Sequence, residues 1–480
     1  MSRANTRVVK IGDRVIGGGN PILIQSMTNT RTEDVQATVA QIQALTAAGC
    51  DIIRCAVPDM AAAEGLKTIC EESPVPVIAD IHFDYKLALA AIEAGVDGLR
   101  LNPGNIGGEE KVRAVVEAAK ERNIPIRIGV NAGSLPKDLL EKYGHPTPEA
   151  LVESAFSHIR MLEDVGFGDI CVSMKSSNVP LMMQAYRLMH ERSDYPLHVG
   201  VTETGTEYMG TIKSAMGIGG LLCLGIGDTI RVSLTEAPEN EIQVAQLLVD
   251  HFARRSGEFA VKYPERYTPT RYCRRSDIQT PLIHSELPAD WRVIEALTEN
   301  PTAELRAAIL SLDRVDEPVA VCRRYEDPTV EAVAVKAAAD LGPLFLDGLA
   351  DGIRIDAPHL SEKEIAEIEL MILQAARVRF SHTEYIACPS CGRTLYDIEK
   401  TLADIKSRTS HLSNLKIGVM GCIVNGPGEM ADADYGYVGA VPGRITLYKG
   451  RTVVARNIPQ QEALDRLVEL IKADGEWVEP

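Results

Sequence analysis

The sequence has no apolar run that approaches the roughly 20 residues a membrane-spanning helix needs. Its first residues, Met1–Arg7, also lack the apolar core of a secretory signal peptide. No G-x-G-x-x-G fingerprint follows the first predicted strand, which disfavours a dinucleotide-binding fold. From these absences we expect a cytoplasmic protein with another kind of α/β architecture.

A net positive charge is missing as well. The 480 residues carry 50 basic and 67 acidic side chains, which gives a formal net charge of −17. A general nucleic-acid binder needs a basic face against the phosphates, so this class is disfavoured, although a local basic pocket is compatible with the composition. The contents of 45% hydrophobic and 24% charged residues are typical of globular protein, and the length predicts two or three domains.

The first half of the chain alternates strand-like and helix-like segments. Eight β-rich runs are predicted at Ile22–Thr28, Ile52–Val57, Pro76–Ile81, Gly98–Pro103, Ile126–Asn131, Asp169–Lys175, Leu197–Thr202 and Thr229–Thr235. Helical patterns are predicted at Glu33–Ala48 with Thr32 as its N-cap, Asp84–Ala94, Glu109–Arg122, Pro148–Val165 and Val179–Arg192. This alternation implies right-handed βαβ units and a parallel sheet. Eight units fit a (β/α)₈ barrel of the TIM type, with a doubly wound open sheet as the alternative.

After about residue 255 the pattern changes. Residues 256–375 read as an inserted α/β middle segment, and residues 376–480 as an α+β domain, so we predict domains at 1–255, 256–375 and 376–480. The strands and the closing helix expected in the last two parts are Val319–Cys322, Gly352–Asp356, Glu384–Ala387, Lys416–Met420, a hairpin of Arg444–Tyr448 with Thr452–Ile458, and the helix Gln461–Ala473.

Polar residues gather where the predicted barrel strands end, which is where barrel enzymes carry their active sites. Five of them are cations: Arg54, Arg100, Arg127, Lys175 and Arg231. The others are Asp80, His82, Asn102, Asn131, Glu203 and Ser233. Five converging cations indicate an anion with more than one charge, and the planar fork of arginine suits phosphate.

A structural explanation competes with this anion site. Charges within apolar runs are costly to bury and often pair with internal carboxylates. Only Asp80 and Glu203 are obvious local counter-charges for the five cations, so internal ion pairs do not explain the whole set. Asp80 could also cap the helix that follows it.

Three of the ten cysteines form a pattern, and a disulfide framework is not expected in a reducing compartment. Cys388 and Cys391 form a C-x-x-C after a predicted strand, and Cys422 follows 31 residues after Cys391. This pattern fits a redox dithiol, a zinc site that lacks its second C-x-x-C, or a four-iron four-sulfur cluster. Only the cluster uses all three thiols, and the Gly/Pro-rich residues after Cys422 could deliver Glu429 as a fourth ligand.

Four stretches resemble the 4-hydroxy-3-methylbut-2-enyl diphosphate synthase family. They are Gln25-Ser-Met-Thr-Asn-Thr, Ala79-Asp-Ile-His-Phe-Asp-Tyr, Leu101-Asn-Pro-Gly-Asn-Ile-Gly and Met420-Gly-Cys-Ile-Val-Asn-Gly-Pro-Gly-Glu. The resemblance covers about residues 5–255 and 370–480. It implies a TIM-like barrel followed by an iron–sulfur domain resembling part of sulfite reductase, in an enzyme of the methylerythritol phosphate route to isoprenoids.

The resemblance also implies a reaction and a set of site residues. The family opens 2-C-methyl-D-erythritol 2,4-cyclodiphosphate reductively and expels water, using two electrons from flavodoxin or ferredoxin. The implied 4Fe-4S ligands are Cys388, Cys391, Cys422 and Glu429. The implied substrate-binding residues are Arg54, His82, Arg100, Asn102, Arg127, Asn131, Lys175, Arg231 and Ser233. Asp80 and Glu203 match carboxylates at the reacting end, with Glu203 as the expected proton donor.

Two other functions remain as alternatives. A zinc-dependent lyase or aldolase on a phosphorylated sugar would use the same cations, with Lys175 as a Schiff-base candidate, and an iron–sulfur carrier would need no cations at a barrel mouth. The resemblance leaves the assembly open as well. Family members without a middle segment work as dimers, in which one chain's cluster domain covers the other chain's barrel. In three-domain members the middle domain could instead act as a spacer that lets the cluster reach its own barrel. We expect a homodimer here too, because about 120 residues is a short spacer around a helix ring tens of Å across.

Overall fold

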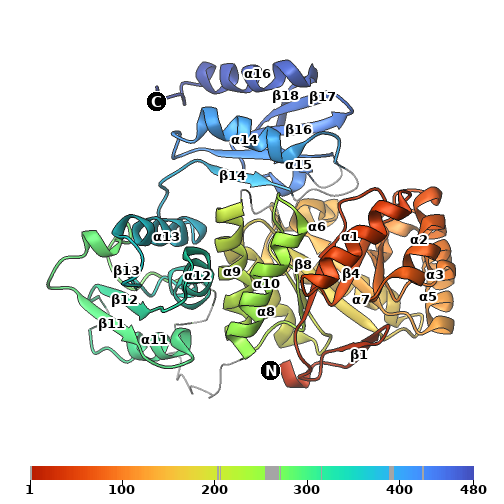
Figure 1. Cartoon of the computed structure of the whole chain (residues 1–480), viewed down its shortest axis with the longest axis horizontal. Coiled ribbons are helices and arrows are strands. Elements are labelled where there is room, and N and C mark those ends of the chain that lie inside the picture. The colour runs from red at the N-terminus through yellow and green to blue at the C-terminus, as the bar shows by residue number, and fades with distance from the viewer. Residues whose placement is uncertain are drawn as a thin grey trace.

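Residues 3–202, 205, 207–253, 267, 270, 272–314, 316–388, 394–423 and 426–479 are described by the computed structural model of the protein. The chain forms three lobes (Figure 1). The barrel lies to the right in this view, the middle segment to the left, and a C-terminal lobe lies over both.

The first lobe is a closed parallel barrel. Its strands are β3 (Leu23–Met27), β4 (Ile52–Ala56), β5 (Val77–Asp80), β6 (Gly98–Leu101), β7 (Ile126–Asn131), β8 (Ile170–Lys175), β9 (His198–Val199) and β10 (Thr229–Ile230). Their order is β8-β7-β6-β5-β4-β3-β10-β9, and a parallel bridge between Val172 and Leu197 joins β8 to β9. The predicted barrel is therefore confirmed and the open sheet was wrong. β9 and β10 are shorter than predicted, and their pairing stops where Gly200 lies against the Arg231 carbonyl.

Within the described part of the chain, ten helices surround or cover this barrel. They are α1 (Val35–Ala47), α2 (Met60–Glu72), α3 (Tyr85–Ala94), α4 (Pro103–Ile106), α5 (Glu109–Arg122), α6 (Lys137–Tyr143), α7 (Pro148–Glu163), α8 (Val179–Arg192), α9 (Glu207–Cys223) and α10 (Pro238–Ala253), with the short η2 (Ala132–Ser134) after β7. The predicted N-cap Thr32 is wrong, because its hydroxyl donates to the Ala56 carbonyl (2.6 Å) and Asp34 caps α1 instead. Asp84, not Asp80, caps α3.

A hairpin that the sequence analysis missed closes the barrel floor. It consists of β1 (Val9–Ile11) and β2 (Arg14–Ile16), preceded by η1 (Arg3–Asn5). Ile11 and Ile16 pack with Ile52, Ile78 and Cys171 in a small apolar cluster. The interior of the barrel is thus sealed at the end opposite to the strand C-termini.

The middle segment contains a three-stranded parallel sheet. Its order is β11 (Arg292–Ala296), β12 (Val319–Arg324) and β13 (Gly352–Asp356), with η3 (His284–Glu286), α11 (Pro301–Leu310), α12 (Val330–Leu346) and α13 (Glu362–Ala375). Helix α12 packs on α9 of the barrel, and nearly all its residues are buried. One continuous apolar core therefore runs through both lobes. The predicted boundary at 255 lies outside the described residues, and the one at 375 stays a prediction.

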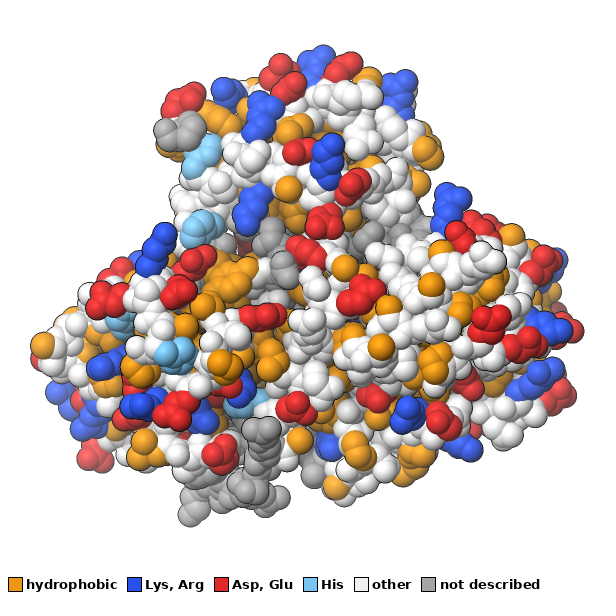
Figure 2. All heavy atoms as spheres, in the orientation of Figure 1, with side chains coloured by type: hydrophobic (Ala, Val, Ile, Leu, Met, Phe, Trp, Pro, Cys, Tyr) orange, Lys and Arg blue, Asp and Glu red, His pale blue; other side chains and the backbone are white. Residues whose placement is uncertain are grey.

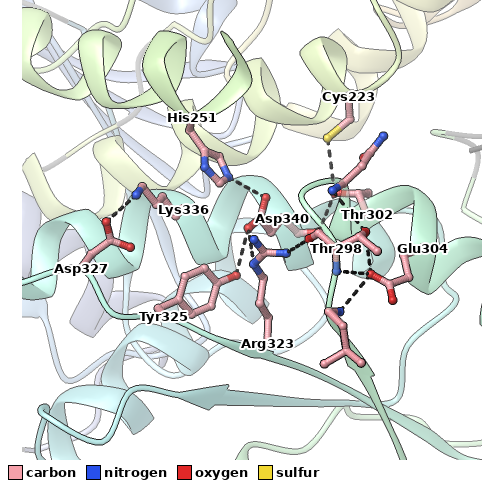
Figure 3. Close-up of polar contacts among 12 residues, drawn as sticks. Cys223, His251, Thr298, Thr302, Glu304, Arg323, Tyr325, Asp327, Lys336 and Asp340 are labelled. Atoms are coloured by element: carbon pink, nitrogen blue, oxygen red, sulfur yellow. Dashed lines mark hydrogen bonds and ion pairs between the residues drawn. The ribbon is translucent and has the colours of Figure 1, made fainter. Parts of the chain in front are cut away.

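A buried polar contact also joins these two lobes (Figure 3). His251 on α10 lies 2.8 Å from the Asp340 carboxylate on α12. The other oxygen of Asp340 accepts from the Tyr325 hydroxyl (3.2 Å) and lies 3.3 Å from Arg323. The middle segment is therefore held to the barrel by both apolar and charged contacts.

The C-terminal lobe has a mixed five-stranded sheet with its own core. Its strands run β14 (Glu384–Ala387), β15 (Lys416–Met420), β16 (Tyr435–Val441), β17 (Arg444–Lys449) and β18 (Thr452–Pro459), with α14 (Ile398–Thr409), α15 (Gly426–Glu429) and α16 (Gln460–Ala473). The first three are parallel and the last two form antiparallel pairs, as an α+β domain requires. Its main apolar cluster contains no barrel residue, so the lobe is a separate body resting on the barrel.

The surface drawn in Figure 2 mixes acidic and basic side chains without a block of one sign. Among the described residues, no helix combines the length and the apolarity that crossing a bilayer requires.

Candidate active site

The alternation of side chains along the barrel strands brings the predicted polar residues into the interior. Asp80 at the end of β5 is only 2% exposed and lies 3.3 Å from Arg100 of β6 and 3.4 Å from His82. Arg100 also donates to the Gly129 carbonyl on β7 (3.0 Å). Burial alone would raise the pKa of Asp80, but His82, Arg54 and Arg100 outweigh it and hold that pKa well below its ordinary value. Asp80 is thus a carboxylate at neutral pH.

Two further cations lie around a thioether. The Nη2 and Nε atoms of Arg54 are 2.9 and 3.3 Å from the Met27 sulfur, and Nη1 of Arg231 is 3.7 Å from it. Burial lowers the pKa of Arg54 well below its ordinary value; Asp80 opposes this, while Arg127, Arg231 and Arg100 add to it. A thioether is a weak acceptor, so this crowding of like charges favours an added anion.

Arg231 has a counter-charge that the sequence analysis missed. Glu241 of α10, 2% exposed, accepts from Nε (3.2 Å) and Nη2 (3.1 Å) of Arg231. The same carboxylate accepts from the Leu234 amide and the Ser26 hydroxyl, both at 3.2 Å. The interpretation that Asp80 and Glu203 were the only local counter-charges was therefore wrong. Glu241 shares the i, i+3, i+4 face of α10 with buried Val244 and Ala245, and this periodicity was the available signal.

The backbone of Arg127, the second residue of β7, lies near the barrel floor. Its side chain donates to the Gln25 side chain of β3 and lines a small apolar cavity with Ile16 and Cys171. Burial, reinforced by Arg100, lowers the pKa of Arg127 to about 10. Within the described residues its Nη2 has no hydrogen-bond partner, so the guanidinium retains an unused donor.

The remaining predicted residues lie nearer the mouth. Asn131 and Lys175 are register partners at the ends of β7 and β8, and Ser233 follows β10. Asn102 accepts from the Gly129 amide (3.0 Å), which ties the turn after β6 to β7. Glu203, the predicted proton donor, lies outside the described residues.

His198 of β9 is a second residue that the sequence analysis missed. It is fully buried, and its Nδ1 lies 2.7 Å from the Thr229 hydroxyl. Burial first, and then the nearby cations including Arg127 and Lys175, hold the pKa of His198 well below its ordinary value. A neutral imidazole therefore belongs to the barrel wall beneath the cations.

The predicted cluster ligands come from the C-terminal lobe. Cys388 directly follows β14 and Cys422 follows β15, and these strands are parallel neighbours, so their ends meet at one sheet edge. The Gly421 amide donates to the Cys388 sulfur (3.2 Å). Cys391 lies outside the described residues. Within the described ranges no three histidine, cysteine or acidic side chains are close enough to hold a metal ion.

Glu429, the predicted fourth ligand, lies at the boundary between the C-terminal lobe and the barrel. It ends α15, is buried, and its carbonyl accepts from the Ser177 hydroxyl just beyond β8 (3.2 Å). A Cβ on Gly133 of η2 would lie 2.9 Å from the Glu429 Cγ. The turn that carries Glu429 therefore reaches the mouth of the barrel in the same chain.

Two family models match this chain in order. The GcpE TIM-barrel domain matches residues 6–246, and the GcpE protein C-terminal domain matches residues 384–473. The middle segment between them is covered by neither match.

Curated relatives match along almost the whole chain. A protein of Porphyromonas gingivalis is 40% identical over 574 aligned residues, spanning 99% of this chain and 98% of that protein. One of Clostridium perfringens is 39% identical over 473 residues, spanning 98% and 99%. Both are named 4-hydroxy-3-methylbut-2-en-1-yl diphosphate synthase (flavodoxin). The first alignment is longer than this chain, so that relative has residues without counterparts here.

Solved structures resemble this chain only distantly. Dihydropteroate synthase from Yersinia pestis superposes on 52% of the chain with a TM-score of 0.39 and 13% identity.

Proposed function

This chain belongs to the GcpE family of 4-hydroxy-3-methylbut-2-en-1-yl diphosphate synthases, and on that premise we propose that it opens 2-C-methyl-D-erythritol 2,4-cyclodiphosphate reductively. The ring opening expels water, takes up two electrons and leaves (E)-4-hydroxy-3-methylbut-2-enyl diphosphate. The observation that carries the proposal is the crowding of five cations inside a barrel that matches this family over residues 6–246.

The cations would bind the diphosphate. Arg54 and Arg127 have neutral side chains, Met27 and Gln25, as their hydrogen-bond acceptors, so both can turn donors toward phosphate oxygens. Arg100 and Arg231 are fixed by Asp80 and Glu241, which holds their guanidinium groups in one orientation. The other proposed contacts to substrate come from His82, Asn102, Asn131, Lys175 and Ser233. Fixed phosphates would hold the ring in the orientation that the reaction needs.

The two carboxylates at the reacting end would have different roles. The low pKa of Asp80 supports a group that stays ionised, orients Arg100 and His82, and accepts a hydrogen bond from a substrate hydroxyl. We assign proton donation to the departing hydroxyl to Glu203, because expulsion of water needs an acid near the reacting carbon. If Glu203→Gln kept near-normal turnover with an intact cluster, this assignment would be wrong.

The C-terminal lobe would hold a 4Fe-4S cluster through Cys388, Cys391, Cys422 and Glu429. Parallel strand ends that bring Cys388 and Cys422 to one edge fit such a group, and an amide hydrogen bond to a cysteine sulfur is a usual means of tuning a cluster potential. When bound, the cluster supplies electrons and a Lewis-acidic iron. The role of the chain is to place the Glu429 turn over the barrel mouth and exclude water there.

Flavodoxin is the proposed electron donor, because the names of the relatives specify it. Ferredoxin stays an alternative. The test is the visible spectrum of protein purified without oxygen, before and after dithionite and the cyclodiphosphate, together with product analysis. A brown protein that dithionite bleaches, that substrate perturbs and that forms the product supports the proposal. A colourless zinc protein would support the lyase alternative instead.

The predicted homodimer stays untested, but the contacts of the C-terminal lobe with its own barrel favour a site completed by one chain. Mixing Arg54→Met with Cys422→Ser distinguishes the two arrangements. A site within one chain regains no activity, whereas exchanged lobes in a mixed dimer would restore part of it. Light scattering on the same sample gives the oligomeric state.

A further inference from the structure

At one point the barrel and the C-terminal lobe approach each other through their backbones. A Cβ on Gly428 of α15 would lie 1.6 Å from the Gly133 carbonyl oxygen and 2.3 Å from its carbon. In the other direction, a Cβ on Gly133 would lie 2.4 Å from the Glu429 amide nitrogen. No side chain fits between η2 and α15 at this point, on either element.

Local conformation does not explain these two glycines. Neither Gly133 nor Gly428 has the positive φ that favours glycine, so an alanine would be compatible with the backbone of each segment alone. What excludes a side chain is the other lobe. The requirement for glycine at both positions therefore comes from contact between the lobes.

Two other contacts hold the same arrangement. Gly205, after β9, lies against the Tyr385 carbonyl of β14, where a Cβ would be 2.4 Å away. Lys213 of α9 and Glu384 of β14 form an ion pair of 2.6 Å, and each side chain is 1% exposed. Both groups are buried, so a shift of the lobe that parted them without admitting water would leave each charge buried and unpaired. The lobe is thus fixed near its first strand as well as at α15.

We infer that the glycine pair Gly133–Gly428 positions the reaction by setting how closely the Glu429 turn approaches the barrel mouth. Gly133 comes two residues after Asn131 and Gly428 immediately precedes Glu429, so the contact links a proposed substrate-binding strand to a proposed cluster ligand. A methyl group on either side would hold the turn away by about the size of the clash. A misplacement of about 1 Å can cost roughly 100-fold in rate. This inference rests on the proposed function for its kinetic part only.

The test uses Gly133→Ala and Gly428→Ala, each as full-length, cluster-loaded protein. Gly108→Ala is the matched control, because Gly108 lies in another loop at the strand C-termini, has φ −69° and has nothing within 4 Å of its Cβ position. Three quantities are measured: turnover of the cyclodiphosphate, cluster content from the visible spectrum, and hydrogen exchange of the amides in residues 384–387 and 426–429.

For both Gly133→Ala and Gly428→Ala we expect kcat to fall about 100-fold. Cluster content should stay unchanged and the KM within a few-fold. Hydrogen exchange of the non-proline amides in residues 426–429 should be at least about tenfold faster, because the C-terminal lobe no longer packs closely on the barrel. Gly108→Ala should match the wild type in all three. Gly133→Ala lies in the barrel, so a loss of activity there with a full cluster cannot come from damage to the cluster site.

Turnover and exchange within twofold of wild type in both variants would overturn the inference. So would a loss of turnover with wild-type exchange, because the glycines would then act without changing the approach. If the wild type itself does not convert the cyclodiphosphate, the proposed function fails, while the exchange measurement still decides whether the glycine pair seats the lobe.

Discussion

The buried charges at the barrel mouth and those inside the middle segment are neutralised differently. In the middle segment, Asp347 accepts from Arg306, the Tyr267 hydroxyl and the Thr270 amide. Asp351 likewise accepts from Arg275, a serine hydroxyl and the Val319 amide. Each acid has three or more partners, as stable interiors require.

At the mouth the balance is reversed. Two described carboxylates, Asp80 and Glu241, contact Arg100 and Arg231, while Arg54 lies on a thioether. Arg54 and Arg127 therefore have neutral hydrogen-bond acceptors, whereas the buried Arg306 and Arg275 of the middle segment donate to carboxylates. The difference teaches that burial of charge alone does not identify a site; the kind of partner does, because a buried cation on a neutral acceptor is one that an anionic ligand can satisfy.

The largest effect is expected in the middle segment. Asp347→Ala removes the carboxylate from buried Arg306 and should lower the free energy of unfolding by about 3–5 kcal/mol. Asp316→Ala is the control, because Asp316 is exposed in the same segment and should change stability by less than about 0.5 kcal/mol. Urea unfolding measures both. If both substitutions lowered the free energy of unfolding by the same small amount, the buried charges of the middle segment would not differ from those at the mouth in how they are neutralised.

The pH dependence of the unfolding free energy tests His158, a buried histidine on α7. Burial lowers the pKa of His158 to about 4, and its Nδ1 accepts from the Gly104 amide (3.3 Å). The unfolded chain binds a proton near pH 6.5 and the folded chain does not. This contribution, about 3 kcal/mol, is therefore complete above pH 6.5 and is lost as the pH falls toward 4. His158→Asn, which retains an acceptor, should flatten the unfolding free energy over this range; an unchanged slope would contradict the assignment.

Removal of a cation at the barrel mouth should not destabilise the ligand-free protein, in contrast to the loss of Asp347 from the middle segment. Arg54→Met should leave the ligand-free protein as stable as the wild type or more so, because like charges are relieved. Pyrophosphate at 100 times its dissociation constant should stabilise the wild type by about 2.7 kcal/mol and the variant far less. Thermal unfolding with and without pyrophosphate measures this, with exposed Arg113→Met as the control. A variant destabilised without ligand would mean that Arg54 is structural.

The smallest effect is expected when Arg231, which Glu241 holds in place, loses the charge of that partner. Glu241→Gln keeps the shape of the side chain that orients Arg231 but removes its charge, so KM should rise about tenfold, or 1.4 kcal/mol, with kcat nearly unchanged. Glu239→Gln, on the same helix turn, is the control. A fall in kcat with constant KM would instead place Glu241 in the chemical step.

Much of the barrel could be predicted because its strands and helices alternate regularly. Ile126–Asn131 and Glu109–Arg122 have the predicted bounds, since apolar runs and amphipathic stripes were both clear there. Helix α9 was missed because it is buried between the barrel and α12 and has no polar stripe. Strand β16 was missed because the glycines at 436 and 439 interrupt its pattern.

The residues of the candidate site also differ in how far the sequence reveals them. Residues at strand ends, such as Arg100 and Lys175, could be found because their position follows from the barrel. Glu241 acts from a helix, where only the periodicity of buried positions marked it. Gly133 acts through an approach of its backbone to another lobe, which no local pattern shows. Contacts between segments distant in sequence need the structure.

The cations inside the barrel, Arg54 above all, are proposed to bind the cyclodiphosphate. Calorimetric titration of the cluster-loaded protein with that compound, without reductant, tests this proposal most directly. We expect one site per chain, weaker at physiological than at low ionic strength and lost in Arg54→Met. A folded protein that shows no binding, or the same affinity in Arg54→Met, would contradict it.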